Sequence, residues 1–211
     1  MDLPGWQAIY EELKDKNFEI VAAAQDTAGE AASGKFYDRA KATFTTLNDP
    51  RHNVSTLYHM INVPTGVWID EDGRIVRPPE VAYSKEQKVL GQTIGDDRYI
   101  EGLYDWVEKG ADSKFVVPVE KLTEQFAVVD PKLQLADTHF KLAVYYHNQG
   151  DEEAAAEHWQ KAQSLNPESW NYHRQQWSFE PKTAMKHWFE KYKALKGKPY
   201  YAPLELPGSE E

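Results

Sequence analysis

The sequence predicts an α/β region followed by an all-α region. Through about residue 110, short apolar runs alternate with segments of helical periodicity, a pattern that favours a sheet with helices on its faces. Residues 66–77 read as a strand, a tight turn and a second strand. From Ala136 onward the periodicity is helical only, and Gly150-Asp151 separates two amphipathic segments. The expected class is therefore an α/β sheet with flanking helices, joined to a C-terminal helical region.

The chain is expected to begin with a helix over residues 1–16. Trp6, Ile9, Tyr10 and Leu13 recur at i, i+3, i+4 and i+7, which places them on one face. The apolar run Phe18–Ala24 then predicts a strand buried on both faces, as in a parallel sheet.

A second helix is expected to follow this strand. Thr27 with Glu30 has the spacing of a capping box, and the helix is expected to run to about Ala42. Phe44–Leu47 predicts a second short strand, and Val54–Met60 predicts a short helix.

The hairpin consists of Gly66–Ile69 and Arg74–Arg77. Its turn contains Asp72-Gly73, and glycine reaches positive φ without a Cβ clash. Pro78-Pro79 is expected to end the second strand because proline cannot donate to a strand ladder. Residues 81–94 are polar and predict an irregular surface excursion, after which a helix begins at Gly95-Asp96 and stops at Gly110.

The C-terminal region is expected to contain a helical hairpin after a bridging segment at 117–131. The hairpin resembles one tetratricopeptide repeat, a helix–turn–helix of about 34 residues. We expect this unit to pack with residues 118–130, 170–177 and a helix at 182–195. The positions that match the repeat are Leu142, Ala143, Tyr146, Gly150, Ala155, Ala162 and Pro167.

Residues 1–110 show a second resemblance. Val63-Pro64-Thr65 followed by an apolar strand, an Asp-Gly turn and another strand resembles the second half of a thioredoxin fold, of the bacterial-type ResA/TlpA-like redoxins. Asp2-Leu3-Pro4 matches the acidic–hydrophobic–Pro signature that follows the redox cysteines in that family. The resemblance implies a cis peptide bond at Pro64, peptide binding by the main chain at Val63, Pro64 and Thr65, and an acidic residue, Asp2, near the cysteines.

The family's Cys-x-x-Cys and the strand before it have no counterpart in this chain. The sequence has no cysteine, and the match places the missing Cys about two positions before Asp2. The missing strand would lie between Phe18–Ala24 and Gly66–Ile69. Either the fold has adapted or the chain is a truncated redoxin. We expect a dimer that fills the gap with a neighbour's segment or, as the weaker choice, direct pairing of the two strands.

The composition excludes several classes of site. A net charge of −10 provides no basic surface for nucleic acid or anionic membrane. The seven histidines form no ligand motif, and no glycine-rich phosphate loop is present, so neither a metal nor a cofactor is expected. The aromatic residues of the helical part are expected to form a core rather than a binding surface. No signal peptide or membrane span is visible, which predicts a cytoplasmic protein, or one of the cell envelope if the chain is truncated.

These observations give two functional readings and a domain division. The first reading is a thioredoxin-family protein related to thiol–disulfide oxidoreductases and inactive as written, because it lacks a thiolate nucleophile. The alternative is a non-enzymatic protein-interaction module that uses the cis-Pro edge or the helical hairpin. The predicted domains are residues 1–112, residues 113–198 and a mobile tail at 199–211.

Overall fold

The computed structural model describes residues 2–89, 91–127 and 130–207. They divide into two compact units, and each unit collects separate stretches of the chain. The strand unit comprises 1–50, 64–125 and 201–211, and the helical unit comprises 51–63 and 126–200. The chain therefore passes between the units after Pro50, Val63, Gln125 and Tyr200. The three-part division expected from the sequence remains a prediction.

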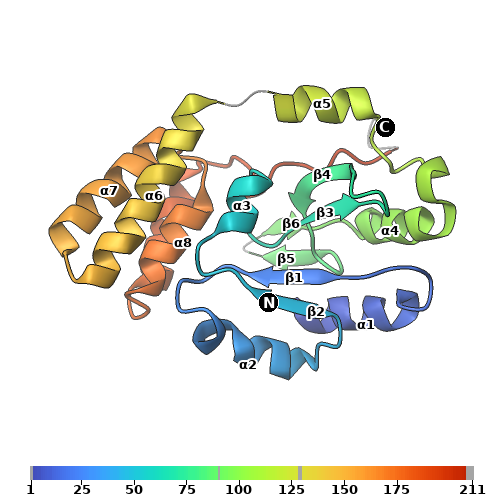
Figure 1. Cartoon of the computed structure of the whole chain (residues 1–211), viewed down its shortest axis with the longest axis horizontal. Helices are drawn as coiled ribbons and strands as arrows, with labels where there is room; N and C mark the ends of the chain where they lie inside the picture. The colour runs from blue at the N-terminus through green and yellow to red at the C-terminus, as the bar shows by residue number, and fades with distance from the viewer. Residues whose placement is uncertain (1, 90, 128–129, 208–211) are drawn as a thin grey trace. The chain divides into compact units, whose positions relative to one another are not determined.

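The strand unit alternates helices and strands, as the sequence predicts (Figure 1). Among the described residues, its elements are α1 (Leu3–Leu13), β1 (Val21–Ala24), α2 (Glu30–Ala40), β2 (Thr45–Asn48), β3 (Thr65–Ile69), β4 (Ile75–Val81), β5 (Gln87–Val89), β6 (Gln92–Ile94), α4 (Asp97–Lys109), the short 3-10 helix η1 (Gly110–Asp112) and most of α5 (Val119–Ala127).

Three separate two-stranded sheets are present in the described part of the unit. β1 pairs with β2 in parallel, β3 with β4 in antiparallel, and β5 with β6 in antiparallel. A single thioredoxin-like sheet is therefore not confirmed. The direct pairing considered for the strands now seen as β1 and β3 is also not observed, because in the described residues β1 pairs with β2 and β3 pairs with β4.

Several local expectations need correction. β4 continues through Pro78-Pro79 because register shifts in its ladder with β3 accommodate residues that cannot donate. Residues 81–94 are not irregular, since they contain the β5–β6 hairpin. The capping box at Thr27 is not formed, because the N-cap of α2 is Gly29, at φ 57°. β1 is not buried on both faces, since the side chain of Val21 is 60% exposed.

The core of the strand unit lies among α1, β3 and α4. Ile9 and Leu13 of α1 pack against Trp68, Tyr99 and other core residues. The ring of Trp68 stacks on Trp106 at 5.2 Å and donates its Nε1–H to the hydroxyl of Tyr99 at 2.8 Å. The remaining buried residues of this cluster are Ala82, Leu103, Phe115 and Leu206.

One fully buried cation stabilises the edge of this core. The guanidinium of Arg77, 1% exposed, donates to both carboxylate oxygens of Glu80 at 2.7 and 3.1 Å. It also donates to the main-chain carbonyls of Phe115 and Glu205, each at 2.9 Å, and lies 5.4 Å from the ring of Trp68. Burial raises the pKa of Glu80, although the adjacent Arg77 acts to lower it. Arg77 thus joins β4 to two segments distant in sequence.

The helical unit contains α3 (Asn53–Leu57), α6 (Pro131–Gln149), α7 (Glu152–Leu165), α8 (Trp170–Ser178) and α9 (Ala184–Ala194) within the described ranges. The α6–α7 hairpin turns at Gly150, whose φ of 77° requires the left-handed region, and Asp151 caps α7 by accepting from Ala154 N–H. The described residues of the segment 117–131, expected as a bridge, contain α5 and the first residue of α6.

The interior of the helical unit is aromatic, as the sequence predicts. Phe140 stacks on Tyr172 at 4.8 Å and meets the edge of Trp159 at 5.5 Å. Small residues on α6 and α7 let the two helices approach closely. They are Ala136, Ala143, Ala155 and Ala162, each no more than 1% exposed.

No helix in the described ranges has the length and hydropathy needed to cross a bilayer.

Candidate functional site

The three residues predicted to bind peptide lie where the chain leaves the helical unit. Val63 is the last residue of that unit's inserted segment, and Pro64 is the first residue of the following stretch of the strand unit. The carbonyl of Pro64 accepts from Ala82 N–H at 3.3 Å, and Thr65 opens β3 opposite Val81. The peptide-binding role of Val63, Pro64 and Thr65 remains a prediction.

Asp2 has a clear structural role. Its carboxylate accepts from the main-chain N–H of Ser84 and, at 2.9 Å, from the Ser84 hydroxyl. Gly5 permits this approach, because a Cβ at that position would lie 1.9 Å from Ser84 Oγ. Asp2 therefore attaches the start of α1 to the connection between β4 and β5.

The helical unit holds a peptide segment of the same chain. Residues 51–63, called here the docked segment, leave the strand unit, form the short helix α3 and return. At the start of α8, the main-chain N–H groups of Trp170 and Asn171 both donate to the carbonyl of Ile61, at 2.7 and 3.2 Å. The side-chain amide of Asn171 donates to the carbonyl of Met60 at 2.8 Å. These contacts recognise main-chain carbonyls, so they do not depend on the side chains of Met60 and Ile61.

Two polar side chains anchor the ends of the docked segment. His52 is 3% exposed; its Nε2 lies 2.8 Å from Gln175 Oε1 on α8, and its ring meets Phe140 edge-on at 4.9 Å. At the other end, Asn62 is 5% exposed and donates to the carbonyl of Tyr200 at 3.4 Å. Between these two anchors the side chain of Leu57 is 73% exposed. The segment is therefore held at its two ends and at Met60 and Ile61.

A small cavity of about 50 Å³ lies between the docked segment and helices α6 and α8. It could hold a few water molecules but is too small for an organic cofactor. At its wall the hydroxyl of Tyr172 donates to Asp137, and burial together with this carboxylate raises the pKa of Tyr172. The lining residues are His52, Ser55, Thr56, His59, Met60, Ile61, Leu133, Asp137, Phe140, Asn166, Ser169, Asn171 and Tyr172.

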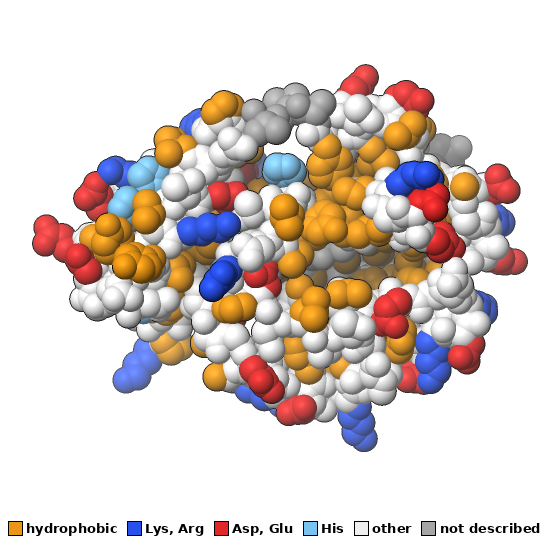
Figure 2. All heavy atoms as spheres, in the orientation of Figure 1, with side chains coloured by type: hydrophobic (Ala, Val, Ile, Leu, Met, Phe, Trp, Pro, Cys, Tyr) orange, Lys and Arg blue, Asp and Glu red, His pale blue; other side chains and the backbone are white. Residues whose placement is uncertain are grey.

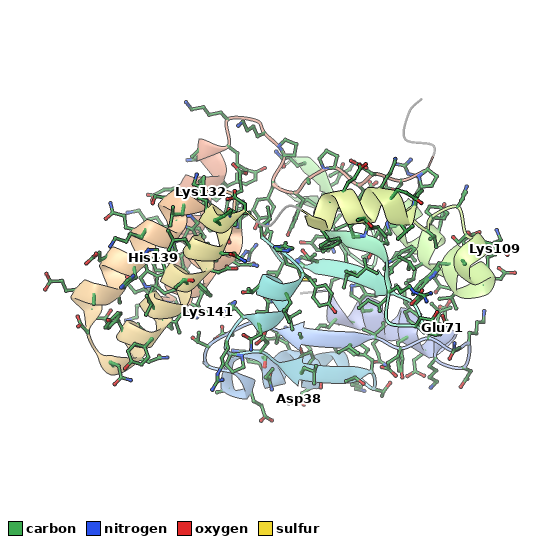
Figure 3. The ribbon with its side chains drawn as sticks, turned by 45° about the horizontal axis from the view of Figure 1, so that its top comes forward. Asp38, Glu71, Lys109, Lys132, His139 and Lys141 are labelled. Carbon is green, nitrogen blue, oxygen red and sulfur yellow. The ribbon has the colours of Figure 1, made fainter. Side chains whose placement is uncertain are left out.

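Histidines meet at one other place in this unit. His139 on α6, labelled in Figure 3, and His158 on α7 have Nδ1 atoms 2.7 Å apart. One ring must donate and the other accept, and burial with the neighbouring His158 lowers the pKa of His139. Across the described ranges, no group of three or more His, Asp or Glu side chains is placed to hold a metal ion.

Sequence reasoning missed the docked segment. The sequence gives no motif at the polar residues that hold this segment, which are His52, Asn62, Asn171 and Gln175. Their contacts join positions more than 100 residues apart, which no local pattern reports. A buried amide requires partners, but the burial of Asn171 and Gln175 is visible only in the structure.

Comparison with known families supports the helical part of this description. The tetratricopeptide repeat model matches residues 136–169, which cover most of α6 and all of α7. Searches of curated proteins and of solved structures found no match to this chain. The resemblance of the strand unit to redoxins therefore has no support from a family model or a relative. Tetratricopeptide repeats commonly mediate contacts between proteins, and residues 136–169 match the model of one such repeat.

Proposed function

We propose that the protein is a non-enzymatic protein-interaction module whose helical unit binds short peptide segments through their main-chain carbonyl groups. The observation that carries the proposal is the docked segment, which this unit already holds in that manner. The N-terminus of α8 and the amide of Asn171 supply three donors to two consecutive carbonyls. Such donors bind the main-chain carbonyls of an exposed turn whatever its side chains are. In the docked segment, the side chain of His52 adds a specific anchor.

The test adds a labelled peptide with the sequence of residues 51–63 to the full chain. In the unmodified protein the docked segment occupies the site, so binding is expected to be weak. His52→Ala removes the anchor to Gln175 and Phe140, and we expect it to lower the peptide's dissociation constant at least about tenfold, as the intramolecular competitor is loosened. Adding Asn171→Ala to His52→Ala is expected to reverse the gain. Fluorescence anisotropy measures each constant.

The matched control is Leu57→Ala, which alters a 73% exposed side chain of the same segment and should leave peptide affinity unchanged. Circular dichroism verifies that each variant keeps its helices. If His52→Ala unfolds the unit, Asn62→Ala loosens the other end instead. Equal peptide affinity in the folded loosened variant and in the unmodified chain would refute the proposal.

For the strand unit we propose a relationship to ResA/TlpA-like redoxins without their activity. The supporting features are the Val63-Pro64-Thr65 step into β3, the β3–β4 hairpin and the helix α4 that follows. Because the chain contains no cysteine, it offers no thiolate to attack a disulfide.

We therefore expect the purified chain to give no turnover in an insulin-reduction assay with dithiothreitol. Thioredoxin added to the same reaction is the positive control. A rate above the dithiothreitol background, in protein shown by mass spectrometry to be free of thioredoxin, would contradict this expectation.

A further inference from the structure

The two helices of the α6–α7 hairpin carry the same short pattern. Residues 136–143 and residues 155–162 both read Ala-x-x-His-aromatic-x-x-Ala, with His139 on α6 and His158 on α7. Since α7 returns along α6 after the turn at Gly150, the two copies of the pattern pack against each other. In each copy the histidine is flanked, one turn before and one turn after, by the small residues that let the helices approach. The packing of the helix interface therefore also brings the two imidazole rings together.

The two rings face each other through the same nitrogen. The Nδ1 atoms of His139 and His158 lie 2.7 Å apart, and the ring centroids lie 5.0 Å apart. Tyr146 of α6 stacks on the ring of His158 at 5.4 Å with 4° between the planes, which holds that ring in its orientation. Both histidines are half-buried, and histidine side chains reach the surface over α6 and α7 in Figure 2. Two imidazole nitrogens thus converge on one point that water can reach.

The distance between these nitrogens fits two ligands at adjacent corners of a metal ion. Two nitrogens that each lie about 2.0 Å from an ion are about 2.8 Å apart at a right angle and about 3.3 Å apart at the tetrahedral angle. The observed 2.7 Å is close to the first value. Right-angled coordination by nitrogen and oxygen is typical of copper(II) and nickel(II), and copper(II) binds a given set of ligands most tightly among the divalent first-row metals. The pair therefore suits copper(II) better than the tetrahedral zinc(II).

The charged side chains beside the pair leave the two rings available to a cation. Glu157 and Lys161 of α7 act on His139 in opposite directions, and they form an ion pair with each other at 2.5 Å, so their charges largely cancel. Burial and the neighbouring His158 lower the pKa of His139. A histidine must be neutral to bind a metal ion, and the lowered pKa keeps this ring neutral around neutral pH.

We propose that His139 and His158 bind one copper(II) ion between α6 and α7. Within the described part of the chain, no third His, Asp or Glu is placed with them, so water completes the coordination. In the hydrogen bond between the rings, one Nδ1 carries the hydrogen. On binding, that hydrogen moves through solvent to Nε2 of its own ring, and both Nδ1 lone pairs then bind the ion without loss of a proton. The site does not use the donors of α8, so it is independent of peptide binding.

The test titrates the full chain, without an affinity tag, with copper(II) chloride at neutral pH in a buffer that contains glycine as a weak competing chelator. Isothermal titration calorimetry is expected to show one ion per chain. His139→Gln and His158→Gln keep a hydrogen-bonding side chain but remove one imidazole, and we expect each to raise the dissociation constant at least about tenfold. His187→Gln is the matched control, because it changes a histidine on α9 whose side chain is 42% exposed, and it should leave the constant unchanged.

Electron paramagnetic resonance of the unmodified chain with one equivalent of copper(II) gives a second readout. We expect hyperfine coupling to two imidazole nitrogens, and circular dichroism verifies that each variant keeps its helices. If a glutamine variant unfolds, the spectrum of the unmodified chain decides alone. Unchanged affinity in both folded variants would mean that copper binds at an adventitious site elsewhere. That result, fewer than two imidazole nitrogens in the spectrum, or no copper binding at all would overturn the proposal.

Discussion

Replacing Arg77 with alanine is expected to lower the free energy of unfolding of the strand unit by about 3–5 kcal/mol. The change leaves the carboxylate of Glu80 at a 12% exposed position without its bidentate partner, and it removes the donors to Phe115 and Glu205. An unpaired buried charge is costly because the low-dielectric interior cannot replace the water that it lost. Urea unfolding followed by tryptophan fluorescence measures the loss, since Trp68 lies 5.4 Å from the guanidinium.

Two further variants separate charge from packing. Arg74→Ala removes a cation whose side chain is 71% exposed on the same hairpin, and we expect a change of less than about 1 kcal/mol. Arg77→Met combined with Glu80→Leu removes both charges and keeps the volume, so it should lose less than Arg77→Ala alone. Equal stability of Arg77→Ala and Arg74→Ala would show that the buried ion pair contributes no more than a surface charge.

Replacing Phe140 with alanine is expected to destabilise the helical unit by about 3–5 kcal/mol. Its ring lies at the centre of an aromatic cluster, where it contacts Trp159, Tyr172 and the edge of His52. Because His52 belongs to the docked segment, amide exchange in residues 51–63 should accelerate together with that of α6. Circular dichroism at increasing urea gives the stability, and hydrogen–deuterium exchange gives the behaviour of the segment.

Phe189→Ala is the matched control, since the same substitution at a 38% exposed ring on α9 removes less buried area. We expect it to cost less than half as much and to leave exchange in residues 51–63 unchanged. Equal costs for the two substitutions would mean that Phe140 does not occupy the centre of this core.

Local patterns predicted the elements in both units where the side-chain periodicity was strong. The face formed by Ile9 and Leu13 does pack into the core, and Gly150 does end α6. Sequence patterns failed where tertiary contacts override propensity. Two prolines in β4 argued against a strand, yet register shifts accommodate them. The apolar run of β1 predicted full burial, but burial depends on which elements cover the two faces of the strand, and Val21 is 60% exposed.

The candidate site was less predictable than the fold. The match to a tetratricopeptide repeat can be read from Ala143, Ala155 and Ala162, because small residues at helical spacing record close helix packing. What this unit holds cannot be read in the same way. The partnership of His52 with Gln175 spans 123 positions, and neither residue carries a motif. The roles of Val63, Pro64 and Thr65 came only from a resemblance, and the structure leaves them as predictions.

The repeated passage of the chain between the two units has a consequence for synthesis on the ribosome. The docked segment leaves the exit tunnel before residues 64–125 and long before α6 and α8 exist to receive it. Until then the contacts of His52 with Gln175 and of Asn62 with Tyr200 cannot form. The strand unit also waits, because its core includes Leu206, which is synthesised after every residue of the helical unit. Neither unit can therefore complete its core from one contiguous stretch of the chain, and the early residues of each wait for residues that are made much later.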